Sequence, residues 1–266
     1  MKVVILCGGR GTRLREETEF RPKPMLPIGN RPILWHIMKL YAHHRFADFV
    51  LCLGYKGHII KEYFLNYKIM THDYALRLGD PSSVKFLPGD DCPEGDWWVT
   101  FAETGEDAMT GARVKRIERY IDSDTFMLTY GDGVADVNLS ALVNFHREHG
   151  KIATVTAVRP SGRFGEIEVA ANGMVASFAE KPQARGGLIN GGFFVFNRRV
   201  FDYLEDDDSF ALEGKPLERL TKEGQLVAFV HDGFWQPMDT YRELSMLNAM
   251  WERGEAPWAV WREGRE

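Results

Sequence analysis

Three kinds of feature are missing from this 266-residue chain, and each absence excludes a class of protein. No apolar run approaches the ~20 residues of a membrane-spanning helix, so we expect no membrane segment. Lys and Arg are scattered and the net charge is −5, which gives no electrostatic reason to expect nucleic acid as a partner. The three cysteines, Cys7, Cys52 and Cys92, form no CxxC pair, and we expect reduced thiols in a cytoplasmic protein.

Two common phosphate-binding motifs are also absent, although a glycine-rich turn follows the first apolar run. The stretch is LCGGRGTRLREETEFRPKPML, residues 6–26. A dinucleotide fingerprint G-x-G-x-x-G that starts at Gly9 would end at Leu14, so the spacing fails, and no G-x-x-x-x-G-K-[ST] run occurs. The failed spacing argues against a nicotinamide-dependent oxidoreductase. It leaves the identity of the turn's ligand open.

Apolar patterns predict an α/β protein. Continuous strand-like runs alternate with helical spacing through about residue 158, which is typical of a mostly parallel central sheet with right-handed crossovers. The later part is smaller and strand-rich, and it closes with a helix. We expect strands at 3–7, 48–54, 97–103, 125–134, 153–158, 166–170, 174–180, 188–196 and 225–236. We expect helices at 31–44, 58–67, 112–121, 139–150 and 241–254, and a loop at 70–95.

The glycine-rich turn has the chemistry of an anion-binding site. In open α/β sheets, ligands bind at the carboxyl ends of the strands, where this turn begins. Gly8, Gly9 and Gly11 allow backbone N–H groups to approach a phosphate, and Arg13 would add a fork of donors. The alternative is an ordinary glycine-rich connection.

The next segment, RPKPML, holds a lysine between two prolines. Pro22 and Pro24 restrict the backbone on both sides of Lys23, which favours a rigid arm that could place one positive charge against a polyphosphate. The alternative is an exposed lysine in a proline-rich loop.

The combination of LCGGRGTRL and RPKPM resembles the signature of the sugar-nucleotide pyrophosphorylases (nucleoside triphosphate:sugar-1-phosphate nucleotidylyltransferases). The stretches PILWHIMKLY, GYKGHIIKEYF, ETGEDAMTGARVKR, YGDGVAD, INGGFFVF and FWQPMDT resemble its cytidylyl branch in particular. The resemblance covers nearly the whole chain and is weakest at 70–95. It implies a Rossmann-like nucleotidyltransferase fold in one domain, 1–266. Within that domain, a nucleotide-binding core would span about 1–158, and a part for sugar binding and oligomer contacts about 159–266.

The resemblance also implies an activity and its participants. CTP and glucose 1-phosphate would give CDP-glucose and pyrophosphate with Mg²⁺ as cofactor, in a homo-oligomer for which the hexamers of the cytidylyl branch offer one size. Such a transfer needs charge stabilisation and alignment rather than a protein nucleophile. The implied catalytic residues are Lys23, Arg13 and Asp132. The implied nucleotide-binding residues are Leu6, Cys7, Gly8, Gly9, Arg10, Gly11, Thr12, Arg13, Lys23, Thr104, Gly105 and Gly131.

Two aspartates match the metal-binding positions of the family. Asp132 lies between two glycines after an apolar strand, where a carboxylate suits a hard cation that keeps several waters. The alternative for Asp132 is a tight turn, and the alternative for Asp239 is a cap of the helix that follows. Nothing in the spacing brings these two residues together, so their pairing depends on the resemblance alone.

Four further residues match sugar-binding positions, namely Gly165, Glu180, Lys181 and Asn190. Without the family, Glu180 and Lys181 are equally well explained as a surface ion pair or a strand end. In related uridylyl and thymidylyl enzymes a glutamine reads the pyrimidine, whereas this chain has Thr104 and no glutamine in that segment. We therefore expect CTP, with some use of UTP, and Thr104 and Gly105 as base contacts. The alternatives are another base or sugar, or a non-catalytic sugar-nucleotide-binding subunit.

Overall fold

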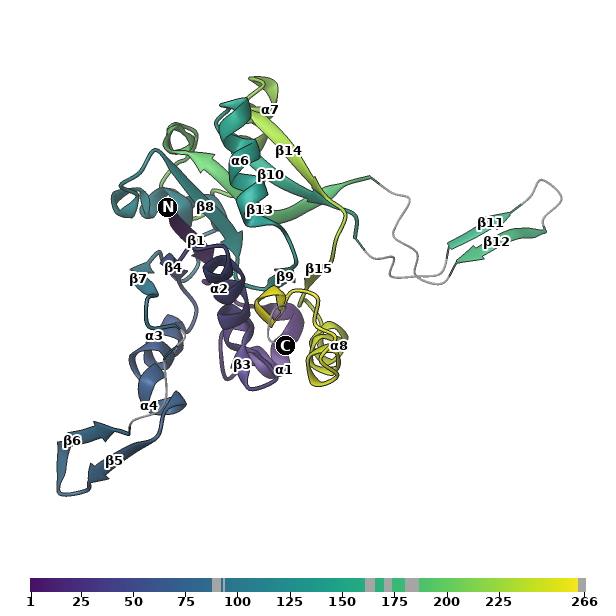
Figure 1. The fold of residues 1–266 in the computed structure, drawn as a ribbon. Coiled ribbons are helices and arrows are strands. Elements are labelled where there is room, and N and C mark those ends of the chain that lie inside the picture. Colours follow the sequence, from purple (N-terminus) through teal and green to yellow (C-terminus); the bar gives the residue numbers. More distant parts are fainter. Residues whose placement is uncertain (88–91, 93, 161–165, 170–173, 180–186, 263–266) are drawn as a thin grey trace.

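The computed structural model describes residues 1–87, 92, 94–160, 166–169, 174–179 and 187–262. Its centre is a seven-stranded sheet in the order β14-β10-β13-β8-β1-β4-β7 (Figure 1). All neighbouring pairs are parallel except those made by β13, which is antiparallel to β10 and β8. This confirms the α/β fold with a mostly parallel sheet. The strands are β1 (Lys2–Leu6), β4 (Asp48–Leu53), β7 (Trp98–Glu103), β8 (Thr125–Tyr130), β10 (Ala153–Val158), β13 (Ile189–Asn197) and β14 (Leu226–His231).

Helices connect these strands. The α-helices are α1 (Arg15–Thr18), α2 (Ile33–His43), α3 (Gly57–Leu65), α4 (Tyr67–Thr71), α5 (Thr110–Arg116), α6 (Leu139–His149), α7 (Lys215–Lys222) and α8 (Tyr241–Glu252). Short 3₁₀ turns are η1 (Thr12–Leu14), η2 (Lys23–Met25), η3 (Glu118–Tyr120), η4 (Arg198–Tyr203) and η5 (Val260–Arg262). Within the described ranges, no helix combines the length and apolar character needed to cross a bilayer.

The central strands bury both faces, because successive side chains of a strand point to opposite sides. Along β1, Val3 and Ile5 join a cluster with α2 and Trp258, whereas Val4 and Leu6 join a second cluster that includes residues of α5 and η4. This explains why the sequence of these strands is continuously apolar rather than alternating. Cys7 and Cys52 are buried in these clusters as free thiols, and burial raises the pKa of both.

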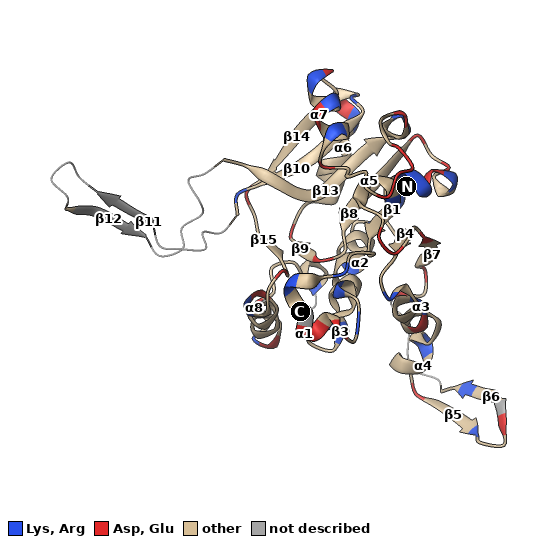
Figure 2. Cartoon of the chain, turned by 180° about the vertical axis from the view of Figure 1, so that it is seen from behind, with Lys and Arg blue, Asp and Glu red and all other residues tan. Residues whose placement is uncertain are grey.

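Four two-stranded sheets surround the central one. They pair β2 (Pro27–Ile28) with β3 (Arg31–Pro32), β5 (Tyr74–Arg77) with β6 (Asp80–Phe86), β9 (Gly133–Ala135) with β15 (Trp235–Pro237), and β11 (Glu166–Val169) with β12 (Val175–Ala179). The β5–β6 and β11–β12 hairpins project from the body in Figure 1. Figure 2 shows basic and acidic residues interspersed along α3, α7 and the β5–β6 hairpin.

Four element predictions need correction. The strand expected at 225–236 is two strands, because residues 232–234 separate β14 from β15. The loop expected at 70–95 is wrong for β5 and β6, whose hairpin shows little apolar alternation because β5 is exposed along its whole length. The strand expected at 125–134 ends at Tyr130, since Gly131 and Asp132 interrupt it before β9. The helix expected at 112–121 begins at Thr110 and continues only as the 3₁₀ turn η3 after Arg116.

The proposed division at about residue 158 does not separate two sheets. Strands β13 and β14, from the later part, lie in the same central sheet as β1 and β8 from the earlier part. Both parts therefore contribute to the edge at which β1 and β8 end, where the candidate site lies.

Candidate active site

A cleft of about 430 Å³ opens at the carboxyl ends of β1 and β8. The two strand ends are joined by a hydrogen bond from the Gly131 N–H to the Leu6 carbonyl (3.0 Å). The cleft is lined by Leu6, Cys7, Gly8, Gly9, Gly11, Thr12, Arg13, Lys23, Pro24, Ala108, Met109, Thr110, Arg113, Tyr130, Gly131, Asp132, Glu213 and Asp239. Its position agrees with the rule that open α/β sheets bind ligands at their carboxyl edge.

The glycine-rich turn needs its glycines for different reasons. Gly11 has a φ of +63°, and a Cβ there would lie 2.8 Å from the Thr18 side chain. The Gly11 carbonyl accepts hydrogen bonds from the Leu14 N–H and the Thr18 hydroxyl, which begins the turn η1. A Cβ on Gly8 would lie only 2.1 Å from the Arg113 guanidinium. Gly8 therefore makes room for a buried charge rather than for a ligand.

Arg113 is a site residue that the sequence predictions missed. It is 4% exposed, and its guanidinium donates to the carbonyls of Gly8, Leu53, Gly105 and Glu106 and to the Thr104 hydroxyl. Burial lowers the pKa of Arg113. Its contacts hold the glycine-rich turn against the 104–106 segment, so this one side chain shapes one wall of the cleft. Arg113 is one of three basic residues in α5, so the sequence offered no signal that separates it from Lys115 and Arg116.

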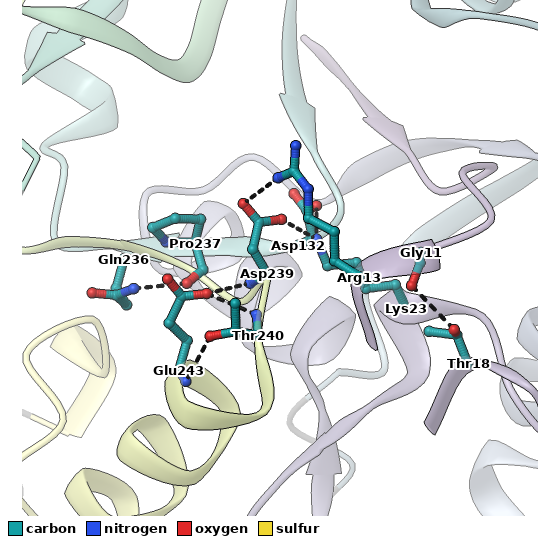
Figure 3. Close-up of polar contacts among 10 residues, drawn as sticks. All are labelled: Gly11, Arg13, Thr18, Lys23, Asp132, Gln236, Pro237, Asp239, Thr240 and Glu243. Carbon is teal, nitrogen blue, oxygen red and sulfur yellow. Dashed lines mark hydrogen bonds and ion pairs between the residues drawn. The ribbon is translucent and has the colours of Figure 1, made fainter. Parts of the chain in front are cut away.

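Lys23, which lines the cleft, lies between two carboxylates (Figure 3). Its Nζ is 2.6 Å from Asp132 Oδ2 and 2.6 Å from Asp239 Oδ1, and the side chain is 11% exposed. Burial lowers the pKa of Lys23, but the two carboxylates more than offset this, so its pKa lies above the ordinary value. The alternative of an exposed lysine in a loop is thereby excluded. Arg13 is mostly exposed, and its Nη1 lies 3.0 Å from Asp239 Oδ2.

The strands β9 and β15 bring Asp132 and Asp239 together. Asp132 precedes β9 and Asp239 follows β15, and the Met238 N–H donates to the Asp132 carbonyl (2.8 Å). Behind Asp239, one oxygen of Glu243 accepts from the N–H groups of Asp239 (2.7 Å) and Thr240 (2.8 Å) (Figure 3). Thr240 and Glu243 form the capping box of α8. The backbone that carries Asp239 is therefore anchored to a helix end, and Asp239 itself is not the cap.

A second cavity of about 260 Å³ lies beside the first and shares Tyr130, Asp132 and Asp239 with it. Asn190 lines this second cavity, where its Oδ1 accepts from the Gly192 N–H and its Nδ2 donates to the Tyr130 hydroxyl. The other predicted sugar-side residues, Gly165, Glu180 and Lys181, lie outside the described residues. Of the four predicted sugar-side residues, Asn190 is therefore the one that the structure describes.

The base contacts expected of Thr104 and Gly105 are not supported by their positions. Thr104 is fully buried, and its hydroxyl donates to the Leu53 carbonyl (2.7 Å) and accepts from Arg113 (2.9 Å). Neither residue is in the lining of the cleft, which is formed on this side by residues 108–110. Arg10 also lies outside the lining, and its guanidinium pairs with Asp107 and Glu106. These residues build the wall of the cleft from behind.

Comparisons with known proteins identify the family of this chain. Residues 2–252 match the family model described as Nucleotidyl transferase. The chain is 49% identical over 262 residues to the glucose-1-phosphate cytidylyltransferase of Salmonella typhimurium, covering 98% of this chain and 100% of the relative. It is 29% identical to a UTP–glucose-1-phosphate uridylyltransferase of Synechocystis, over 84% of this chain and 56% of that protein.

Solved structures share the fold at low sequence identity. UDP-glucose pyrophosphorylase in complex with UDP-glucose has a TM-score of 0.68 at 14% identity, covering 95% of this chain and 98% of that one. HddC from Yersinia pseudotuberculosis has a TM-score of 0.66 at 22% identity, covering 94% and 99%. At these identities the likeness concerns the fold alone.

Proposed function

The chain belongs to the nucleotidyl transferase family, and from this premise we propose that it transfers a cytidylyl group from CTP to α-D-glucose 1-phosphate. The products are CDP-glucose and pyrophosphate. The choice of CTP and glucose follows from the 49% identity to the Salmonella typhimurium protein over nearly the whole of both chains. The alternatives of another base or sugar are distinguished by the experiment below.

Lys23, Asp132 and Asp239 converge on one point of the cleft. This convergence is the observation that supports nucleotidyl transfer as the class of reaction. A nucleotidyl transfer between two phosphates needs positive charge at the transferring group and carboxylates that can hold a divalent cation. Lys23 supplies such a charge, and Asp132 and Asp239 supply two carboxylates beside it. A silent binding subunit would have no need to hold a buried lysine between two acids. This arrangement therefore favours catalysis over binding alone.

In the proposed reaction, a phosphate oxygen of glucose 1-phosphate attacks the α-phosphorus of CTP in line with the departing pyrophosphate. The P–O bond to the β-phosphate breaks as the new P–O bond forms, and no protein nucleophile takes part. Lys23 neutralises charge on the transferring and leaving phosphates, and Arg13 holds the triphosphate. The glycine-rich turn, Leu6 to Arg13, and Gly131 enclose the nucleotide.

We assign the family's divalent cation, which we propose to be Mg²⁺, to Asp132 and Asp239. The residues fit, because their carboxylates already converge on the positive charge of Lys23. Within the described residues no three His, Cys, Asp or Glu side chains are grouped as metal ligands, so the protein would supply this pair of carboxylates only. Two carboxylates suit Mg²⁺, which keeps several waters and takes its other ligands from phosphates. When bound, the cation supplies charge neutralisation to the triphosphate.

The sugar end of the substrate is assigned to the second cavity. Asn190, which lines it, is proposed to bind sugar hydroxyls, together with Gly165 and Glu180, and Lys181 is proposed to bind the sugar phosphate. The two cavities share Tyr130, Asp132 and Asp239, which supports a path from one substrate to the other.

We also propose that the protein is a homo-oligomer. Support comes from large apolar side chains left exposed near and on the β5–β6 hairpin, including Leu65, Leu78 and Trp98. Light scattering of the purified protein should give a mass above that of one chain. The mass of a single chain at micromolar concentration would contradict the proposal.

The substrates can be tested by measuring pyrophosphate release with CTP, UTP, dTTP, ATP and GTP, each paired with glucose, mannose and galactose 1-phosphate. We expect CTP with glucose 1-phosphate to give the highest kcat/KM and UTP to give a lower but measurable one. A highest rate with UTP or dTTP would overturn the assignment of the base. A highest rate with another sugar would overturn the assignment of glucose, and no release with any pair would overturn the proposed activity.

A further inference from the structure

Glu213 lies in the wall of the nucleotide cleft and has no role in the reaction described above. It directly precedes Gly214, the residue before α7, so it comes from the later part of the chain. The Tyr130 hydroxyl, from the end of β8, donates to its Oε1. The Thr110 hydroxyl, at the start of α5, donates to its Oε2 (2.5 Å). Three segments distant in sequence therefore meet to fix the orientation of one carboxylate.

The hydrogen-bonding capacity of this wall can be counted. An ionised carboxylate only accepts, so the hydroxyl protons of Tyr130 and Thr110 are both committed to Glu213. The Thr110 oxygen also accepts from the Leu212 N–H (2.9 Å), and the Tyr130 oxygen accepts from Asn190 Nδ2 (3.3 Å). The remaining capacity consists of lone pairs on Glu213. At this part of the cleft, the free lone pairs of Glu213 can therefore accept hydrogen bonds from donor groups of a ligand.

The charge of Glu213 narrows the choice of ligand group. Within the described part of the chain, no Lys, Arg or His forms an ion pair with it, and its side chain faces an open cleft. A phosphate placed against this carboxylate would be repelled, whereas Arg13 and Lys23, which line the same cleft, attract phosphates. The nucleoside is the uncharged part of the ligand that carries donors.

The ribose is the nucleoside group placed closest to Glu213. The α-phosphate must lie near Lys23 and Asp132, and the ribose is bonded directly to that phosphate. Tyr130 is two residues before Asp132 and lines both cavities, so Glu213, held by Tyr130, stands next to the phosphate site. The base is attached farther along the nucleotide and would lie toward the lining residues Gly8, Gly9 and 108–109.

We propose that Glu213 accepts a hydrogen bond from the 2′-hydroxyl of the ribose, with Tyr130 and Thr110 as positioning residues, and thereby selects ribonucleotides over 2′-deoxyribonucleotides. This inference depends on the proposed function for the identity of the nucleotide. An acidic residue serves the same chemistry in dinucleotide-binding folds, where it binds a ribose hydroxyl.

The test is calorimetric binding of CTP, 2′-deoxy-CTP and UTP, with Mg²⁺ present, to the wild-type protein and to Glu213→Ala, Glu213→Gln and Glu218→Ala. The wild type should bind CTP about tenfold or more tightly than 2′-deoxy-CTP. The deoxynucleotide lacks the hydroxyl that donates a hydrogen bond to the charged carboxylate. Glu213→Ala should bind both CTP and 2′-deoxy-CTP with the affinity that the wild type has for 2′-deoxy-CTP. Glu218, an exposed residue in the first turn of α7 and outside the cleft, is the matched control.

Binding of 2′-deoxy-CTP also serves as the folding control, because Glu213→Ala should bind it within about twofold of the wild type. Glu213→Gln, which keeps the shape but loses the charge, should lie between the wild type and Glu213→Ala. Unchanged discrimination between CTP and 2′-deoxy-CTP in Glu213→Ala would overturn the inference. The inference would also be overturned if Glu213→Ala lost only the discrimination between CTP and UTP. That result would mean that the carboxylate contacts the base rather than the ribose. If the wild type binds another nucleotide instead of CTP, the proposed function fails, and the same ribose comparison with that nucleotide still tests Glu213.

Discussion

Lys23 and Asp239 are separated by 216 positions in the sequence, yet Nζ of the lysine lies 2.6 Å from Oδ1 of the aspartate. Asp132 contacts the same ammonium at the same distance. The positive group proposed to act on phosphates is thus held by the carboxylates proposed to bind the metal. The ion pairs keep all three side chains in place in the absence of ligand, and they must rearrange when a metal and a triphosphate bind.

Replacement of Lys23 by alanine should reduce kcat by about 100-fold or more, since a preorganised charge at the transferring phosphate would be lost. The measurement is steady-state pyrophosphate release at saturating CTP and glucose 1-phosphate. Lys61→Ala is the control, because Lys61 forms a surface ion pair with Glu103 outside the cleft. Near-normal turnover of the Lys23 variant would remove its proposed role.

The same ion pairs predict competition between Lys23 and the metal. Without nucleotide, Lys23→Met should bind Mn²⁺ about tenfold more tightly than the wild type, because the metal no longer has to displace an ammonium that gains roughly 1.4 kcal/mol or more from its two carboxylates. Electron paramagnetic resonance of free Mn²⁺ measures this directly. Adding Asp132→Asn to the variant should abolish the gain. Equal Mn²⁺ affinities of the wild type and Lys23→Met would contradict the competition.

Glu243 should act on the metal site through the backbone of Asp239. Glu243→Ala removes the acceptor for two N–H groups, and we expect about a tenfold loss of Mn²⁺ affinity together with about 1 kcal/mol of stability from the lost helix cap. Glu243→Gln keeps one oxygen that can accept from both N–H groups, so it should restore both properties. If the two variants lose Mn²⁺ affinity equally, the charge of Glu243 matters and the positioning role is wrong.

His36 should make the protein less stable in mild acid. Its Nε2 donates to the Ile28 carbonyl, and its Nδ1 accepts from the Trp258 indole, so the packed imidazole is neutral. Burial lowers the pKa of His36 from 6.5 to about 4. The unfolded chain therefore binds a proton before the folded one does, and stability is lost as the pH falls from about 6.5 towards 4.

At pH 5 the contribution of His36 to this loss is about 2 kcal/mol. Urea unfolding at pH 7 and pH 5 gives the difference in the free energy of unfolding between the two pH values. This difference should be smaller in His36→Gln than in the wild type by about the same amount. His43→Gln, at an exposed position of the same helix, should leave the difference unchanged. An unchanged pH dependence in His36→Gln would argue against a neutral, buried imidazole.

Much of the fold could be predicted from local patterns. The continuous apolar runs at Lys2–Leu6 and Asp48–Leu53 lie between two buried clusters, which is why they do not alternate. The β5–β6 hairpin could not be found in this way, because its exposed strands bury no face and leave little hydrophobic period.

In the candidate site too, features that depend on local sequence could be predicted, and features that depend on distant segments could not. The glycine-rich turn and the Pro-Lys-Pro arm are local, since glycine and proline act on the backbone at their own positions. Arg113 and Glu213 gave no comparable signal, because their roles depend on partners from other segments, such as the Gly8 carbonyl and the Tyr130 hydroxyl.

The class of the fold and the prediction of an anion-binding turn follow from the sequence alone, because both depend on hydrophobic period and on backbone conformation over a few residues. The packing of distant segments brings Asp132 and Asp239 to Lys23, buries Thr104 outside the lining of the cleft, and places Glu213 in that lining. The physical reason is that the packing of β9 on β15 and of α5 and α7 around the sheet sets these distances. No spacing along the chain encodes them.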